Sequence, residues 1–210
     1  EWQRMSGMFT SSDIGSISAS DAPDLSNVTN ISTMFSGTSN FNSNINHWDT
    51  SNVTNMFSLF SNTSAFNQPL SNWNVGAVLT MENMFLNATA FNQPLNDWDV
   101  SSVTTMYFMF GQAVAFNQPL SDWDTSSVVN MQFMFTQAEA FNSSINGWDV
   151  SNVTNMMSMF AQATSFNQPL NNWNTSSLQI LNATFYGATS FNQPLDNWDV
   201  SNVVTMFIMF

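Results

Sequence analysis

The feature of this sequence that most constrains its fold is a repeat with a strict period of 25 residues. We number each repeat from the Phe that begins it. With this numbering, position 2 is always Asn, position 8 is always Trp and position 20 is always Phe. The residues at position 1 are Phe41, Phe66, Phe91, Phe116, Phe141, Phe166 and Phe191. Because one such unit cannot bury its own apolar face, the units must stack.

The spacing inside the repeat predicts a fold class. A period between 20 and 29 residues is typical of leucine-rich-repeat solenoids. In the repeat that begins at Phe91, the alternation of Trp98 and Val100 predicts a short strand, and the helical spacing of Val103 and Met106 with positions 20 and 23 predicts a short helix. Ser at position 11 favours a helix start, and Asn and Pro at positions 2 and 4 favour a return turn. The sequence therefore predicts an α/β solenoid of leucine-rich-repeat-like coils, each with a short parallel strand, a short helix and an extended return.

The chain as a whole, residues 1–210, is predicted to form one repeat array. Residues 1–15 match a partial first coil once one extra residue is allowed, and 16–40 form a divergent coil in which SDAPD replaces the usual Phe and Trp. Six full coils follow at 41–190, and 191–210 begin a last coil. Neither end shows the polar caps of natural arrays, so we expect a segment of a longer array.

The charge balance limits the partners of this chain. Fourteen acidic residues stand against a single base, Arg4, which gives a net charge of −13. Such a charge disfavours binding to nucleic acids and to anionic membranes. The chain has no cysteine, which excludes disulfides and thiolate metal sites, and no apolar run approaches the ~20 residues of a membrane span. Calcium, basic proteins and neutral sugars remain open as partners.

Catalysis has little support in the sequence. The only histidine is His47, lysine is absent, and no serine or acid is marked as a partner of this histidine. The carboxylates recur with the repeat, which is typical of a solvated face and not of a catalytic pair in a cleft. We therefore expect no enzymatic activity, no catalytic residues and no cofactor, with calcium as the one candidate ligand.

The joint recurrence of Phe, Asn, Trp and Met-Phe at fixed offsets carries a family resemblance. The chain resembles the BspA-like leucine-rich-repeat surface proteins, whose repeats read F-N-x-x-L-x-x-W-x-V-S-x-V-T-x-M-x-x-M-F. The match covers residues 16–210, and 1–9 less cleanly. The resemblance implies a secreted or cell-surface protein, often linked with adhesion, that has no enzymatic activity and no catalytic residues to carry over.

Position 9 of the repeat is a candidate ligand position. It lies between two inward positions of the predicted strand, so its side chain is expected to point outward. Stacked strands would set these carboxylates about 4.8 Å apart, where they attract cations such as Ca²⁺. The alternative is that each Asp caps the next element or keeps the strand soluble. The acidic face, including two residues of position 7, consists of Asp49, Asp97, Asp99, Asp122, Asp124, Asp149 and Asp199.

Positions 14, 18 and 21 are expected to face away from the apolar stripe of the predicted helix. This face should be polar, yet several repeats carry large apolar residues there. Adjacent exposed rings would form a patch, and such patches mark contacts with other chains. The candidate partner-contact residues are Leu79, Leu86, Phe108, Val129, Phe133, Tyr186 and Ile208.

Asn-x-Ser/Thr sites are frequent because the chain is rich in these residues. Asn62 and Asn87, at position 22, are the better glycosylation candidates in a eukaryotic secretory host.

Two functions from different classes follow. The first is a non-enzymatic extracellular surface protein that acts in adhesion or recognition, with other protein chains or host and cell-surface ligands as partners. The second is a structural subunit that self-assembles, building a surface filament or sheath by end-to-end and lateral packing of solenoids.

Overall fold

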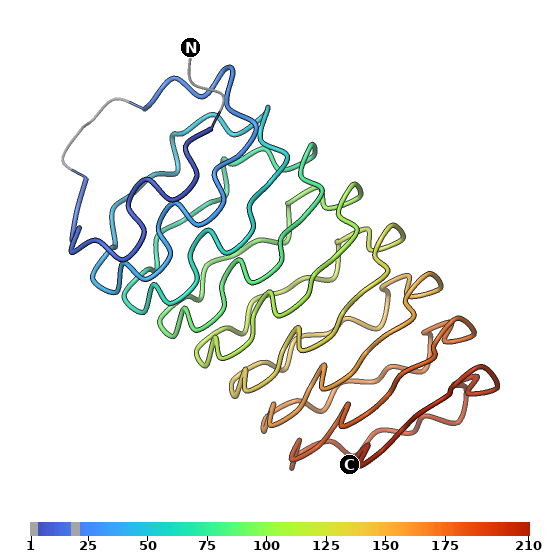
Figure 1. Ribbon diagram of the computed structural model, residues 1–210. Helices are drawn as coiled ribbons and strands as arrows, with labels where there is room; N and C mark the ends of the chain where they lie inside the picture. Colours follow the sequence, from blue (N-terminus) through green and yellow to red (C-terminus); the bar gives the residue numbers. More distant parts are fainter. Residues whose placement is uncertain (1–3, 18–21) are drawn as a thin grey trace.

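The computed structural model describes residues 4–17 and 22–210 (Figure 1). The chain winds into a stack of similar coils that follow one another from the N-terminal to the C-terminal end. Neighbouring coils are joined at position 15 by parallel bridges such as Asn55 with Thr80 and Thr80 with Thr105. The molecule is therefore a solenoid in which one turn corresponds to one sequence repeat. The predicted first and second coils also include residues 1–3 and 18–21, which lie outside the described residues.

The predicted α/β composition of the coils is wrong. The described residues form no helix, and their extended structure is limited to isolated single-residue bridges. These bridges lie inside the predicted helix, and not at positions 8 to 10, where the strand is predicted. The bridged pairs are Arg4–Asn30, Asn30–Asn55, Asn55–Thr80, Thr80–Thr105, Thr105–Asn130, Asn130–Asn155, Asn155–Ile180 and Ile180–Thr205. No helix able to cross a membrane is found among the described residues.

The direction of the backbone N–H groups explains why no helix forms. In the repeat that begins at Phe91, the N–H groups of Met106, Phe108, Phe110 and Gln112 donate to carbonyl oxygens of the next coil, over 2.7–3.0 Å. In an α-helix these groups would donate to carbonyls four residues back in the same segment. Here they point along the solenoid axis, so each coil is hydrogen-bonded to its neighbour as parallel strands are.

The residues between these donors close tight turns. The N–H groups of Met109, Gly111 and Ala113 each donate to the carbonyl three residues back, over 3.1–3.2 Å. Phe108 and Gln112 have φ of 55° and 60°, in the left-handed region, and this pattern recurs at positions 18 and 22 of the other coils. A right-handed helix does not accept a left-handed residue every four positions. The apolar spacing of three to four residues therefore comes from consecutive turns.

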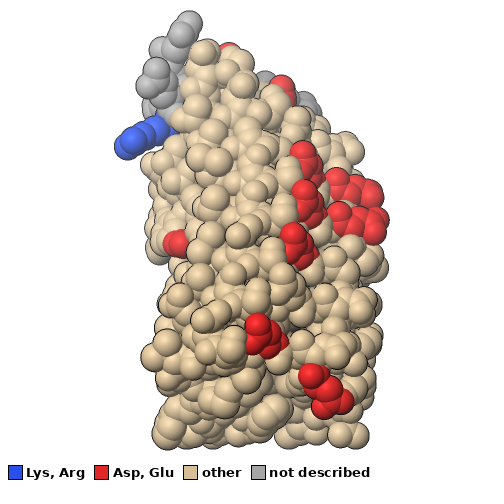
Figure 2. Space-filling view, turned by 90° about the vertical axis from the view of Figure 1, so that its right-hand side faces the viewer, with Lys and Arg blue, Asp and Glu red and all other residues tan. Residues whose placement is uncertain are grey.

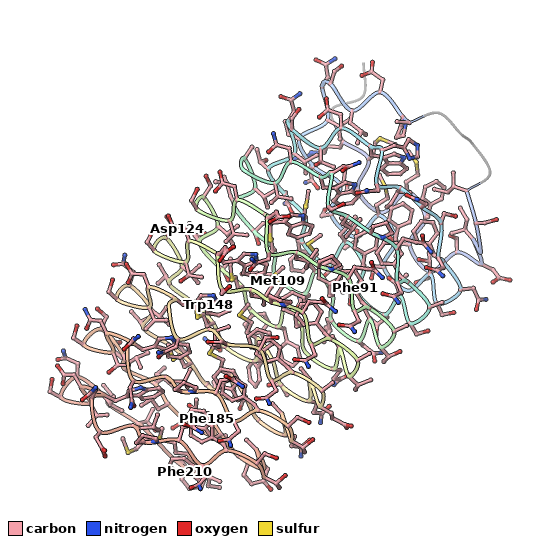
Figure 3. All side chains as sticks on the ribbon, turned by 180° about the vertical axis from the view of Figure 1, so that it is seen from behind. Phe91, Met109, Asp124, Trp148, Phe185 and Phe210 are labelled. Carbon is pink, nitrogen blue, oxygen red and sulfur yellow. The ribbon has the colours of Figure 1, made fainter. Side chains whose placement is uncertain are left out.

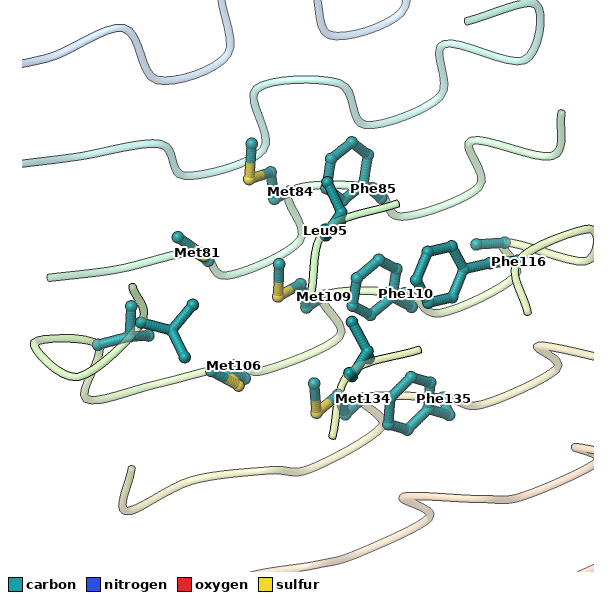
Figure 4. Packing of buried hydrophobic residues seen from close by; sticks show 14 of the residues in the cluster. Met81, Met84, Phe85, Leu95, Met106, Met109, Phe110, Phe116, Met134 and Phe135 are labelled. Atoms are coloured by element: carbon teal, nitrogen blue, oxygen red, sulfur yellow. The ribbon is translucent and has the colours of Figure 1, made fainter. Parts of the chain in front are cut away.

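Aromatic columns fill the interior. The rings at position 20 stack between neighbouring coils from Phe9 to Phe210, with centroids 5.5–5.8 Å apart. A second column, formed by position 1, lies only 3.9–4.2 Å from the first. Met side chains of position 19 pack beside these rings, and those of position 16 lie farther along the same buried interior (Figure 4). Trp148 and Met109 lie in the interior, whereas Asp124 lies at an edge of the stack (Figure 3).

Two polar ladders fix the register of the stack. Each indole N–H from Trp73 to Trp198 donates to the position 5 carbonyl of the preceding coil, over 2.8–3.2 Å. Each Asn side-chain oxygen at position 2, from Asn42 to Asn167, accepts the backbone N–H of the next Asn in the series, over 2.8–3.0 Å. Because a shift by one residue breaks both ladders, the coils stay aligned.

Candidate functional site

The series of consecutive turns presents one surface of the solenoid, which we call the turn face. It is formed by positions 17, 18, 21 and 22. Positions 18 and 22 mostly carry small or amide side chains such as Asn83, Gln112 and Ser158. Position 17 instead alternates between polar residues and large apolar ones such as Phe57 and Met157. Aromatic residues at position 18 are therefore departures from the repeat, whereas large residues at position 17 recur in every second coil.

Three rings meet on the turn face in neighbouring coils and form what we call the aromatic cluster, Tyr107, Phe108 and Phe133. The centroids of Phe108 and Phe133 lie 4.8 Å apart, and Tyr107 meets Phe133 edge-on at 5.8 Å. All three side chains are half-buried. The ring of Phe108 lies over Gly111, where any Cβ would overlap it, and Leu86 reaches the same spot. The structure thus brings three of the predicted contact residues together, namely Leu86, Phe108 and Phe133.

The backbone conformation of the aromatic cluster is unfavourable for its residues. Phe108 and Phe133 have φ of 55° and 58°. Bulky residues are rare in this region, and each costs about 1–3 kcal/mol. Asn83, one coil before Phe108, occupies the same conformation with a residue type that tolerates it. The fold therefore accepts, but does not require, Phe at these two positions.

A single acid lies beside the aromatic cluster. Glu82 is the only acidic residue at positions 17, 18, 21 and 22. The carbonyl of Glu82 accepts the N–H of Ser58 at 2.8 Å, and the carbonyl of Tyr107 accepts the N–H of Asn83 at 2.8 Å. Glu82 and Tyr107 therefore occupy the same position in neighbouring coils and lie side by side. The Glu82 carboxylate also accepts the hydroxyl of Thr105 at 3.0 Å. Its orientation toward the coil of Tyr107 is thus fixed.

The other predicted contact residues lie elsewhere. Tyr186 and Ile208 line a separate shallow hollow of about 250 Å³ near the C-terminal end, together with Met157 and Phe207. Leu79 and Val129 are exposed at position 14. The residue between them in the stack is Thr104, which donates its N–H to Leu79 and accepts that of Val129. Leu79 and Val129 are therefore isolated from each other.

The acidic face consists of exposed side chains that follow one another along the stack (Figure 2). At position 9, Asp49, Asp99, Asp124, Asp149 and Asp199 each accept the backbone N–H two residues on, over 2.9–3.1 Å. These contacts match the capping alternative, although what is capped is a turn and not a helix. In the described residues, no group of three or more His, Cys, Asp or Glu side chains is arranged to hold a metal ion.

Serine residues lower the pKa of several of these carboxyls. Hydrogen bonds from the hydroxyl and then the backbone N–H of Ser126 hold the pKa of Asp124 below its ordinary value, and burial opposes this weakly. The same holds for Asp49 with Ser51 and for Asp199 with Ser201. The two position 7 acids, Asp97 and Asp122, are exposed. Asp122 accepts the side-chain amide of Asn96 from the preceding coil at 2.7 Å.

The two glycosylation candidates are neighbours in the stack. Both have left-handed φ, and the side-chain amide of Asn87 donates to the side-chain oxygen of Asn62 at 3.0 Å. Asn62 is exposed and Asn87 is half-buried. The side-chain amide of Asn62 also donates a hydrogen bond, to the hydroxyl of Ser61 at 3.0 Å, so only its greater exposure favours Asn62 as the acceptor.

Sequence reasoning missed Tyr107, Glu82 and Gly111 as part of the site. Position 17 is half-buried on the turn face, but a helical pattern does not mark it as a contact position. The usable signal is the run of two aromatic residues, Tyr107 and Phe108, which no other coil has at positions 17 and 18. Gly at position 21 next to it supplies the room for the ring of Phe108.

Comparison with known protein families finds one that matches most of this chain. The family model described as "Mycoplasma protein of unknown function, DUF285" matches residues 3–123 and 115–210. The chain belongs to the DUF285 family. The more specific resemblance to BspA-like repeats is not confirmed by these comparisons.

Comparisons of this DUF285 chain with curated proteins and with solved structures assign no function to it. No functionally curated protein matches its sequence. Among solved structures, it has a weak similarity to a leucine-rich-repeat protein described as "Crystal structure of TLR13-ssRNA13 complex", with 12% sequence identity and a TM-score of 0.30. The alignment covers 84% of the DUF285 chain and 32% of the other chain, so the DUF285 chain spans about a third of that structure. At this TM-score the similarity does not establish a common fold or function.

Proposed function

We propose that the chain is a non-enzymatic recognition protein that acts outside the cell or at its surface and binds another protein through the turn face. The observation that carries the proposal is the contact between Phe108 and Phe133, whose rings meet at the surface although both residues have left-handed φ. Strained conformations of this kind cluster at ligand and partner sites. No catalytic residue and no cofactor is part of the proposal.

Neighbouring coils support a role beyond folding. At position 18 the preceding coil has Asn83 and the following coil has Ser158, both with left-handed φ. The turn therefore forms without an aromatic side chain at this position. Aromatic side chains are enriched in the buried parts of protein interfaces, where a few of them supply most of the binding free energy. The location outside the cell rests on the resemblance of the repeats to surface proteins.

The test is binding of the fluorescently labelled chain to intact cells, both of the source organism and of organisms that it contacts. The informative variant is Phe108→Asn combined with Phe133→Asn, because Asn tolerates the left-handed turn. We expect saturable binding of the unaltered chain, with affinity at least about tenfold lower for the double variant. Leu79→Thr is the matched control, since it removes an exposed apolar side chain outside the aromatic cluster.

Equal binding by the double variant and the unaltered chain would contradict the role of the turn face. If the unaltered chain binds no cell but forms filaments in electron micrographs, and the double variant forms none, the structural-subunit alternative replaces the recognition role. In that case the aromatic cluster is a lateral contact between solenoids.

A further inference from the structure

We propose that the aromatic cluster and Glu82 together form a site for a basic side chain, Arg or Lys, of a partner protein. This inference deepens the proposed function and rests on it. It names the chemistry of the partner and not only the surface that meets it.

The first argument is the local arrangement of one charge and several rings. Glu82 and Tyr107 are adjacent in the same row of the stack, and Phe108 and Phe133 join Tyr107 with centroid separations of 4.8–5.8 Å. A cation is attracted to the face of an aromatic ring within about 6 Å of its centroid, and a carboxylate beside the ring adds direct charge pairing. An Arg side chain satisfies both, because its planar guanidinium stacks on rings and donates to carboxylates.

The second argument is the lack of an internal cation. The chain contains one Arg and no Lys, and Arg4 lies in the first coil, bridged to Asn30. Three successive bridges separate Arg4 from Thr80, in the coil of Glu82. Among residues 4–17 and 22–210, the only side-chain hydrogen-bond partner of the Glu82 carboxylate is a neutral hydroxyl, that of Thr105. A basic side chain that pairs with Glu82 would therefore come from another molecule.

The third argument favours a basic protein over a second copy as the occupant. Each copy carries a net charge of −13, so two copies repel each other, and each offers only Arg4 as a basic group. A basic protein is attracted to this chain at long range and then finds the one acid of the turn face next to its largest group of rings. Charge complementarity of this kind sets the choice of partner and the rate of association.

The experiment uses two short peptides that differ only in charge. The probe is acetyl-Gly-Arg-Gly-Arg-Gly-amide, and the control is the same peptide with citrulline, which has the shape of Arg but no charge. Binding is followed by NMR through the ring signals of Tyr107, Phe108 and Phe133 in the full chain. We expect saturable shifts with the Arg peptide and at least about fivefold weaker binding of the citrulline peptide.

Two variants separate the local site from the overall charge. Glu82→Gln and Glu139→Gln each remove one negative charge, but Glu139 is exposed at position 24, outside the turn face. We expect Glu82→Gln to weaken binding of the Arg peptide at least about fivefold and Glu139→Gln to leave it nearly unchanged. Equal losses in both variants, or equal affinity for both peptides, would overturn the inference. A neutral chitotriose that shifts the same ring signals while the Arg peptide does not would show a sugar site instead.

The outcome is separable from that of the proposed function. If cell binding depends on Phe108 and Phe133 but the Arg peptide causes no shift, the recognition role stands and the basic-side-chain site is wrong. If the Arg peptide binds at Glu82 but the chain binds no cell, the site is real and the recognition role at cells is wrong.

Discussion

The indole N–H of Trp148 donates a hydrogen bond to the backbone carbonyl of Leu120, in the preceding coil, at 2.8 Å. The same contact links six successive Trp residues to the coil before each of them. A buried carbonyl that loses its partner destabilises a protein by about 1–3 kcal/mol. The Trp side chains thus contribute to the hydrophobic core and also hold neighbouring coils in register through their hydrogen bonds.

Replacement of Trp148 by Phe tests this register. We expect the free energy of unfolding to fall by about 2–4 kcal/mol, since the carbonyl of Leu120 loses its donor and a smaller ring leaves a cavity. Chemical denaturation followed by circular dichroism measures the change. Phe141→Leu serves for comparison, because it removes ring atoms from the core without removing a hydrogen bond. A loss for Trp148→Phe that is smaller than for Phe141→Leu would contradict the prediction.

The Asn ladder gives a second prediction. The side-chain oxygen of Asn92 accepts the backbone N–H of Asn117 and the side-chain amide of Gln118, both at 3.0 Å. Asn92→Leu removes this acceptor, and we expect the free energy of unfolding to fall by about 1–3 kcal/mol. Asn92→Asp keeps an acceptor of the same shape, so at pH 7 it should retain most of the stability. Equal unfolding midpoints for the Leu and Asp variants would show that the ladder contributes nothing.

The acid dependence of stability follows from the lowered pKa of Asp124. A carboxyl whose pKa is lower in the folded than in the unfolded chain stabilises the fold above the unfolded value, about 4, and this contribution disappears as the pH falls through the folded pKa. The side chain is exposed, so the effect on stability is small. NMR titration should find the pKa of Asp124 below that of a free Asp. Ser126→Ala should raise it part of the way, since the backbone N–H remains as a donor. An unchanged pKa in this variant would contradict the assignment of its cause.

The strained aromatic residues give a fourth prediction. The double variant Phe108→Asn and Phe133→Asn relieves two unfavourable left-handed residues, about 1–3 kcal/mol each, and loses two half-buried rings of comparable contribution. We therefore expect the free energy of unfolding to change by less than about 1 kcal/mol. Phe110→Asn, in the buried column, should abolish folding or cost more than about 4 kcal/mol. If the double variant is destabilised as strongly as Phe110→Asn, the rings are structural.

Gly111 controls the position of Phe108. In Gly111→Thr, the added Cβ would overlap the ring of Phe108, so we expect the ring to leave Leu86 and the ring-current shifts of the aromatic cluster to change. Ser36→Thr is the control at the same position of another coil, because Thr136 shows that the fold accepts Thr there. Affinity for cells should fall with the first variant and not with the second. Unaltered ring signals in Gly111→Thr would contradict the prediction, because they would mean that the ring of Phe108 has not moved.

Parts of the candidate site could be read from the sequence. Phe108 and Phe133 stand out because no other copy has an aromatic residue at their position, and the exposed Asp residues of position 9 follow from their place between the buried positions 8 and 10. Glu82 and Tyr107 are 25 residues apart, so the period already makes them neighbours, but the predicted helix gave no reason to treat position 17 as a contact position. The strain at Phe108 was equally hidden, because it depends on the local turn and not on residue type.

The sequence by itself determined the period of the solenoid and the side chains that point inward. Apolar residues repeated every 25 positions can be buried only against their own copies, so the Phe, Trp and Met columns follow from the pattern. Only the tertiary structure decided the backbone path. Apolar residues three and four apart suit a helix and a series of turns equally well. The turns are formed because the N–H groups of Met106 and Phe108 find carbonyls in the next coil, and that coil is present only once the chain has stacked.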